Sequence, residues 1–206
     1  MSTSTPAPAP GPIGNHFDKY GSGNAIERRM MAGFMASLDR LLDGPAPTAV
    51  LEVGVGEGEV LQRVQRRFPE ARCLGVDLPD DSLPDEWAAR GVTAEFGDVT
   101  ALRFDDRSFD LVLAIEVLEH VPDVDAALSE IARVCSGAVV LSVPFEPIWR
   151  IGNMARGRYL RDLGNTPGHV NHWTRWSFAR VVGRHFDVQQ VLNPMPWTML
   201  RAVPRR

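Results

Sequence analysis

Apolar and polar positions along the chain predict strands and helices in alternation. Short apolar, β-branched runs predict buried strands over residues 50–53, 71–78 and 138–143, with a further strand within 108–120 that runs into an acidic turn. Apolar residues at helical spacing predict helices over 25–42, 59–68, 84–90 and 123–135. Such alternation is typical of a parallel sheet with helices on both faces.

The two ends of the chain differ in character. Residues 1–14 are rich in Ser, Thr and Pro, and we expect them to form a disordered tail ahead of one domain over 15–206. The helix over 123–135 is expected to begin at Asp123 and to stop at Gly137. Near the end, a helix over 175–185 and strands over 188–192 and 198–203 complete the domain.

The segment Val50–Leu61 carries the most specific pattern. Its strand breaks into Gly54, Gly56 and Gly58 and then turns helical. A strand, a glycine-rich loop and a helix N-terminus form the usual cradle for a nucleotide-like ligand. The loop with Val55 inside it is therefore predicted to bind a cofactor.

Carboxylates in and before this loop indicate which cofactor it takes. Glu52, Glu57 and Glu59 would lie close to a bound pyrophosphate, and like charges in contact are costly. S-adenosylmethionine has no phosphate and carries a sulfonium and an ammonium, so it suits this loop. Glu59 also occupies the place of the third glycine in the dinucleotide fingerprint, which disfavours the alternative of a dinucleotide-dependent reductase.

Further acids stand where the next strands end. Asp77 can accept hydrogen bonds from both ribose hydroxyls, although it would suit NAD equally well. Asp98 can accept from an adenine amino group, and Leu78 and Val99 are predicted to sandwich the adenine. These acids extend the predicted cofactor site across three strand ends.

Four motifs in a fixed order resemble a known family. They are Leu51–Gly58, Gly75–Asp77, Gly97–Val99, and Phe109–Val112 followed by Glu116–Val121. The chain from residue 15 onward resembles a class I S-adenosylmethionine-dependent methyltransferase of the type 11 group. The resemblance implies a Rossmann-like α/β fold: a seven-stranded, mostly parallel sheet with helices on both faces, one antiparallel edge strand and a lid inserted after the fifth strand, over 145–172.

The resemblance also implies cofactor contacts and a reaction. Besides the loop and the acids above, it assigns Glu116 to the cofactor, together with Tyr20 in a segment that closes over the cofactor in relatives. The implied reaction is methyl transfer to a small-molecule acceptor, with O-methylation favoured.

Catalysis centres on two polar segments. Glu116, Glu119 and His120 lie three and four residues apart on one turn, and His169 and His172 follow much later. Some metal-dependent relatives use a similar Glu-x-x-Glu-His cluster, which makes Glu116, Glu119, His120 and His172 candidate ligands of Mg²⁺ or Zn²⁺ that chelates a diol. In type 11 relatives with no known metal, Glu119 and His120 form local hydrogen bonds. Without a metal, His169 or His172 is the candidate general base. His120 is a further catalytic candidate.

The predicted lid bears on the substrate. It contains four arginines, Arg150, Arg156, Arg158 and Arg161, among aromatic and apolar residues. They could clamp an anionic substrate, form an interfacial helix that suits a lipid or quinone-like substrate at a membrane surface, or simply be solvated. A protein that binds the cofactor without transferring a methyl group is the remaining alternative.

The composition limits which kinds of partner and which location we expect for the chain. The chain has 206 residues and a formal net charge of −4, which argues against nucleic acid as the main partner. Two cysteines, Cys73 and Cys135, have no zinc-like or disulfide spacing. We see no signal peptide and no apolar run long enough to span a bilayer, so a cytoplasmic location is expected. The Arg-over-Lys bias suggests a bacterial source, and the sequence leaves the oligomeric state open.

Overall fold

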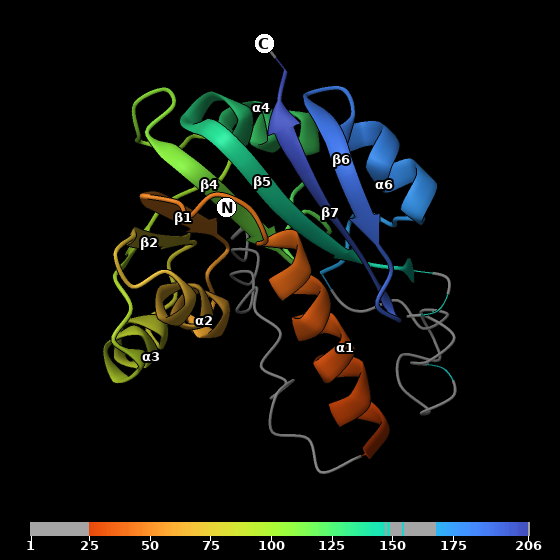
Figure 1. Cartoon of the computed structure of the whole chain (residues 1–206), viewed down its shortest axis with the longest axis horizontal. Coiled ribbons are helices and arrows are strands. Elements are labelled where there is room, and N and C mark those ends of the chain that lie inside the picture. The colour runs from red at the N-terminus through yellow and green to blue at the C-terminus, as the bar shows by residue number, and fades with distance from the viewer. Residues whose placement is uncertain (1–24, 147, 149–153, 155–167, 206) are drawn as a thin grey trace, which may run out of the picture.

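The computed structural model describes residues 25–146, 148, 154 and 168–205 (Figure 1). The predicted tail over 1–14, Tyr20 and most of the predicted lid over 145–172 lie outside these residues. The strands are β1 (Ala49–Val53), β2 (Arg72–Asp77), β3 (Ala94–Phe96), β4 (Phe109–Ile115), β5 (Cys135–Pro144), β6 (Phe186–Leu192) and β7 (Trp197–Pro204).

These strands form one sheet in the order β3-β2-β1-β4-β5-β7-β6. The pairs among β1 to β5 are parallel, whereas β7 runs antiparallel to both β5 and β6. The predicted seven-stranded, mostly parallel sheet is confirmed, with β7 as its antiparallel strand, beside the outermost strand β6. The strand order reverses between β1 and β4, and in open α/β sheets ligands bind at the carboxyl ends of strands at such a point.

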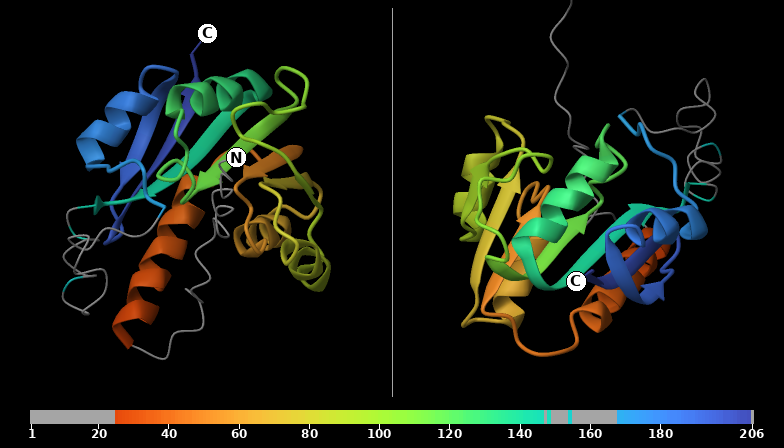
Figure 2. Two further views of the ribbon diagram at one scale, coloured as in Figure 1. Left: turned by 180° about the vertical axis from the view of Figure 1, so that it is seen from behind. Right: turned by 90° about the horizontal axis from the view of Figure 1, so that it is seen from above.

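Helices cover both faces of the sheet, as predicted (Figure 2). One face packs against α1 (Ala25–Leu41), α2 (Glu59–Arg67) and α3 (Leu83–Arg90), through buried residues such as Phe34, Leu61 and Trp87. The other face packs against α4 (Val124–Val134) and α6 (Arg175–Val182), through Leu128, Ile131 and Phe178. Among the described helices, none is long and apolar enough to cross a membrane.

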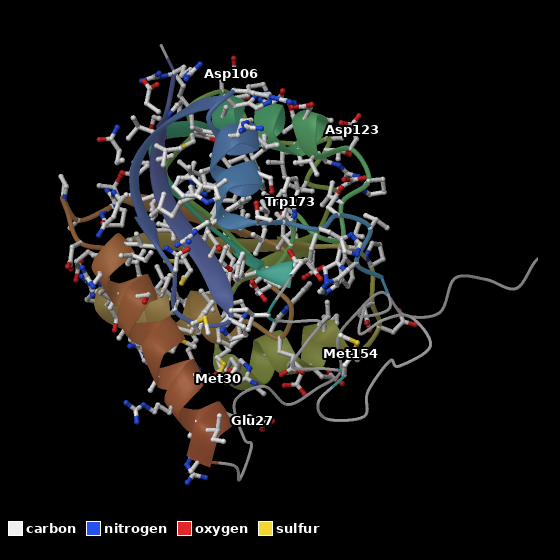
Figure 3. All side chains as sticks on the ribbon, turned by 90° about the vertical axis from the view of Figure 1, so that its right-hand side faces the viewer. Glu27, Met30, Asp106, Asp123, Met154 and Trp173 are labelled. Atoms are coloured by element: carbon white, nitrogen blue, oxygen red, sulfur yellow. The ribbon has the colours of Figure 1, made fainter. Side chains whose placement is uncertain are left out.

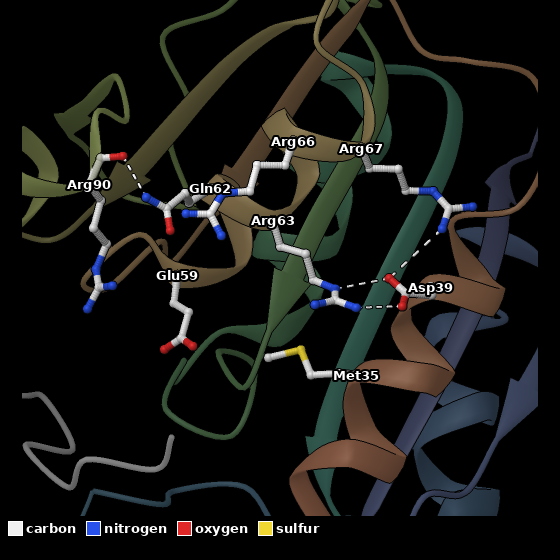
Figure 4. A pocket seen from close by; sticks show the side chains of 8 residues that line it. All are labelled: Met35, Asp39, Glu59, Gln62, Arg63, Arg66, Arg67 and Arg90. Atoms are coloured by element: carbon white, nitrogen blue, oxygen red, sulfur yellow. Dashed lines mark hydrogen bonds and ion pairs between the residues drawn. The ribbon is translucent and has the colours of Figure 1, made fainter. Parts of the chain in front are cut away.

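A hollow of about 340 Å³ lies between α1, α2 and α3, lined by Arg63, Arg66, Arg67 and Arg90 together with Asp39 and Glu59 (Figure 4). Arg63 bonds Asp39 in a bidentate pair, with Nε to Oδ1 at 3.0 Å and Nη2 to Oδ2 at 2.6 Å. The Arg63 hydrogen bond lowers the pKa of Asp39 despite partial burial. Because Arg63 and Arg67 of α2 both pair with Asp39 of α1, this hollow is a polar junction between the two helices.

The junction between α4 and β5 differs from the expectation. Cys135 follows α4 in an extended conformation, so the helix passes directly into the strand and Gly137 lies inside β5 rather than stopping the helix. A Cβ at Gly137 would lie 2.2 Å from the backbone oxygen of Asp110. The β4–β5 register is irregular at this point, and the strands approach so closely that only glycine fits.

Both cysteines are free and buried. Burial raises the pKa of each thiol to about 11, with the Glu52 carboxyl as a second cause at Cys73. A thiol with a raised pKa holds little thiolate near neutral pH, so both behave as small apolar residues.

Candidate functional site

The glycine loop lies at the carboxyl end of β1, where the strand order reverses. Gly54 has φ of 67°, and a Cβ there would lie 2.2 Å from Val117 Cγ2. Val117 belongs to the turn that follows β4 and carries Glu116, Glu119 and His120. The close approach at Gly54 therefore places the predicted cofactor loop directly against the turn that carries the predicted catalytic residues.

The loop is held in place from two sides. Asp77 Oδ2 accepts a hydrogen bond from the Gly56 N–H at 2.6 Å, and its Oδ1 accepts one from the Leu78 N–H at 2.7 Å. Trp87 Nε1 donates to the Gly56 carbonyl oxygen at 2.7 Å. Burial raises the pKa of Asp77, and the two backbone hydrogen bonds oppose this shift. Trp87 was not among the predicted residues, because a tryptophan in an amphipathic helix looks like a core residue.

Glu52 is buried beneath this loop, with 2% of its surface exposed. Among the described residues, its Oε2 atom has no hydrogen-bond partner. Burial raises the pKa of Glu52 well above its usual range, Asp77 raises it further, and a hydrogen bond from the Leu61 N–H acts in the other direction. A buried carboxyl with an unpaired oxygen fits a ligand that brings a positive charge, as the ammonium of S-adenosylmethionine would.

The residues predicted to contact adenine lie at the ends of β2 and β3. Asp98 Oδ1 accepts hydrogen bonds from the Thr100 N–H at 2.8 Å and from the Thr100 hydroxyl at 2.7 Å. Leu78 is 47% exposed, whereas Val99 is partly buried against the core. Phe96, which the sequence analysis did not single out, is 37% exposed at the same edge. Leu78 and Phe96 thus give this edge two accessible apolar side chains.

Glu116 turns toward the neighbouring strands. It has φ of 59°, and its N–H donates to the Ser142 carbonyl oxygen at 3.1 Å. Its carboxylate accepts from Ser142 Oγ at 3.1 Å and from Trp197 Nε1 at 2.7 Å. A left-handed backbone is uncommon for a residue with a side chain, and these contacts to β5 and β7 hold it there.

A different trio is brought together one turn further on. Glu119, His120 and His169 each offer a ligand-type atom, and these atoms lie within 4.8 Å of one another. Glu119 and His169 are buried, and the two imidazole rings meet edge to face with centroids 4.9 Å apart. His120 Nδ1 lies 3.0 Å from the Gly168 carbonyl oxygen, which can only accept, so we assign the proton to Nδ1.

This trio differs from the predicted ligand set. The trio contains His169 where His172 was expected. Glu116, also an expected ligand, bonds Ser142 and Trp197 instead. His172 is exposed, whereas His169 is 6% exposed. The buried His169 is therefore the histidine of this segment whose ligand atom lies with those of Glu119 and His120.

The loop that carries His169 is fastened to the turn that carries Glu119. The N–H groups of Val170 and Asn171 donate to the Glu119 carbonyl oxygen at 2.9 and 3.1 Å. Asn171 Nδ2 donates to the carbonyl oxygens of Leu118 at 3.0 Å and Val121 at 2.7 Å. These bonds join segments that lie about fifty residues apart in the sequence.

One buried acid was missed by the sequence analysis. Glu146, just after β5, has its Oε1 atom 2.8 Å from His169 Nδ1, and both side chains are buried. The Glu146 N–H donates to the carbonyl oxygen of Trp173, which lies close to α6 (Figure 3). A single glutamate after a strand has no sequence signature, so only the three-dimensional structure reveals the pair.

Comparison with known proteins identifies the family. The family model described as a methyltransferase domain matches residues 51–141. A demethylmenaquinone methyltransferase from Roseiflexus castenholzii is 33% identical over 180 residues, which cover 81% of this chain and 74% of that protein. The chain belongs to the class I S-adenosylmethionine-dependent methyltransferases. The predicted family and cofactor are thereby confirmed.

Another relative matches a shorter stretch of this chain, and a solved structure matches most of it. A malonyl-[acyl-carrier protein] O-methyltransferase from Methylococcus capsulatus is 30% identical over 53% of this chain, and only 41% of that protein is covered. The solved structure of a Pyrococcus horikoshii protein superposes with a TM-score of 0.70 at 17% identity, over 92% of this chain and 97% of that one. At that identity the structural likeness supports the fold alone.

Proposed function

We propose that this methyltransferase O-methylates a small-molecule acceptor that carries a hydroxyl group, with His169 as the general base. The observation that carries the proposal is the buried imidazole of His169, whose Nδ1 lies 2.8 Å from Glu146 Oε1. Because a carboxylate only accepts hydrogen bonds, we assign a proton to Nδ1, so that in the neutral ring Nε2 carries the lone pair. A neutral imidazole suits removal of a proton from a hydroxyl group near neutral pH.

The residues predicted around the glycine loop hold the cofactor in this proposal. S-adenosylmethionine, when bound, supplies a methyl group on a positively charged sulfur. We assign Glu52 to its ammonium, Asp77 to its ribose, and Leu78, Asp98 and Val99 to its adenine. The acceptor oxygen bonds to the methyl carbon with a lone pair, its proton passes to Nε2, and the electron pair of the broken carbon–sulfur bond stays on sulfur. Alignment of the reacting atoms supplies much of the rate.

A quinone-like acceptor is the second candidate. It is supported by the similarity to a demethylmenaquinone methyltransferase over 81% of this chain. The aromatic and arginine-rich composition of residues 145–172 also suits a lipid-soluble substrate at a membrane surface. An acceptor panel separates the two candidates directly.

A metal ion would give the trio a second role. Two imidazoles and one carboxylate match Zn²⁺ and similar transition metals better than Mg²⁺, which prefers oxygen ligands. We propose Glu119, His120 and His169 as the ligands of such an ion, in place of the set expected from the sequence. Metal analysis of the purified protein, with affinity for Co²⁺ followed by absorbance in wild type and H120A, tests this role. A protein that binds no Zn²⁺ or Co²⁺ and keeps full activity in chelator would exclude it.

The experiment on the main proposal has two stages. Calorimetric titration with S-adenosylhomocysteine, with NAD⁺ as the control ligand, checks the cofactor site. Methyl transfer is then measured to 3,4-dihydroxybenzoate, demethylmenaquinone and tryptamine, which present an anionic diol, a quinone and an amine. We expect transfer to the diol, and a loss of about 100-fold or more in kcat for H169A with unchanged S-adenosylhomocysteine affinity.

Two outcomes would overturn the proposal. Transfer to tryptamine alone would exclude O-methylation, and transfer to demethylmenaquinone alone would favour the second candidate. The matched control is H185A, because His185 Nε2 also bonds a carboxylate, Asp125 Oδ1 at 2.9 Å, but that acid is 59% exposed and the pair lies outside the trio. A loss in H185A as large as in H169A would show that the assay reports general damage.

A further inference from the structure

We infer that Glu146 is a positioning residue that fixes the tautomer and the orientation of His169. The inference rests on the role proposed above for His169 and adds a residue to which neither the sequence motifs nor the family resemblance gives a role. The carboxylate and the imidazole are 4% and 3% exposed, and Oε1 lies 2.8 Å from Nδ1. A hydrogen bond of this kind, shielded from water, is stronger than one at the surface.

The carboxylate of Glu146 is set in place by its own backbone. The Glu146 N–H donates to the Trp173 carbonyl oxygen at 3.1 Å, and the neighbouring Phe145 N–H donates to the Pro196 carbonyl oxygen at 2.8 Å. Both anchors lie in segments that follow His169 along the chain. Glu146 is therefore fixed to the same part of the molecule as the imidazole that it contacts.

His169 has little freedom to turn away. The N–H groups of the next two residues, Val170 and Asn171, hold the loop to Glu119, and the His120 ring stands at 81° to the His169 ring. Among the described residues, the other carboxylate oxygen of Glu146, Oε2, is buried without a hydrogen-bond partner. The described structure thus gives this buried acid one side-chain partner, which is the imidazole.

This geometry gives Glu146 two effects on catalysis. It keeps the proton on Nδ1, so that Nε2 presents its lone pair, and it places a negative charge beside the imidazolium that forms when Nε2 takes a proton. Either use of His169, as base or as metal ligand, needs the same tautomer. Loss of Glu146 should therefore reduce turnover without weakening the cofactor site.

The first test is the tautomer itself. Full-length protein labelled with ¹⁵N-histidine is studied by NMR near neutral pH, with ring signals assigned by comparison with H169A. We expect wild type to show a protonated Nδ1 and an unprotonated Nε2 on His169, and E146L to show a mixture. E146Q should keep the wild-type tautomer, because its amide oxygen can still accept. A proton on Nε2 in wild type, or an unchanged tautomer in E146L, would overturn the inference.

Kinetics provide the second test. With the acceptor found in the panel above, we expect kcat to fall about 10- to 100-fold in E146L and less in E146Q, with KM and S-adenosylhomocysteine affinity within about twofold of wild type. The double variant E146L/H169A should be no slower than H169A, because Glu146 acts through that ring. Additive losses would contradict the inference. If E146L does not fold, E146D replaces it, since a carboxylate one methylene shorter cannot keep the same contact.

The matched control is the surface pair of His185 and Asp125, which has the same chemistry at 2.9 Å. D125L should leave kcat unchanged. If wild type methylates none of the acceptors, the proposed function fails, but the NMR result still decides whether Glu146 sets the tautomer of His169. The two failures are therefore distinguishable.

Discussion

The cofactor loop and the histidine trio lie side by side but are built differently. The loop and its supports, Glu52 to Asp98, come from one stretch of the sequence and rely on backbone N–H groups and glycines. The trio and Glu146 come from three separate segments and rely on bonds between those segments, such as the one that joins His169 to Glu146. The cofactor loop is therefore a local motif, which we call the local half of the site. The trio with Glu146, which we call the assembled half, forms only when the sheet is assembled.

The same contrast explains what the sequence could predict. The strand–loop–helix pattern and most of the strands follow from local periodicity and from glycine spacing, whereas the seven-stranded sheet was implied by the resemblance to the family. Glu146 could not be found, because its meaning depends on a partner 23 residues away in another segment. His169 and His172 could not be separated, because which of them is buried depends on the segments that pack against this loop, and the sequence alone does not place those segments. The role of Gly137 was misinterpreted for a related reason. Only glycine fits at this position because the backbone of another strand approaches it closely.

The largest expected effect tests the local half. G54A places a Cβ against Val117 and forces a side chain into a left-handed backbone, so we expect a loss of about 2–4 kcal/mol in stability and no measurable S-adenosylhomocysteine binding. Thermal melts and calorimetry measure both. G91A is the matched control, because Gly91 has the same φ of 67° and nothing within 4 Å of its Cβ. G54A/V117A should recover part of the loss; no recovery would show that the Val117 contact is unimportant.

The second prediction tests the assembled half. H169A should lower kcat by about 100-fold or more, as expected for loss of a general base, whereas H172A should change it less than about threefold. Steady-state kinetics with a saturating cofactor concentration check the ratio. Equal losses in the two variants would remove the distinction between the buried and the exposed histidine.

The third prediction uses the pH dependence of the local half. Because burial raises the pKa of Glu52, the folded state favours the protonated carboxyl, and stability should fall as the pH rises through that raised pKa. E52Q removes this dependence, so the ligand-free variant should become more stable than wild type by about 1–3 kcal/mol at the alkaline end. Denaturant melts at pH 5 and pH 8 measure the gap. The pKa of Asp77 is also raised, so E52Q should keep a smaller slope of the same sign.

Parallel stability curves for wild type and E52Q would show that Glu52 is not buried as a carboxylic acid. Titration with S-adenosylhomocysteine completes the test, because E52Q should bind it more weakly despite being more stable.

The smallest effect concerns the support of the loop. W87F removes the hydrogen bond to the Gly56 carbonyl oxygen but keeps an aromatic ring, so we expect a loss of about 1 kcal/mol in stability. Cofactor affinity should fall about fivefold, with kcat unchanged at saturation. A fall in kcat would mean that the position of the loop also affects the trio, although the two are built from different segments.

Asn171 determines how the assembled half responds to its surroundings. Its side chain joins two chain segments, because Nδ2 donates hydrogen bonds to the backbone carbonyl oxygens of both Leu118 and Val121. An amide is neutral, so its charge does not change with pH. The connection between the two segments therefore depends on no charged group, so the framework of the trio should stay assembled across the pH range in which the protein is folded.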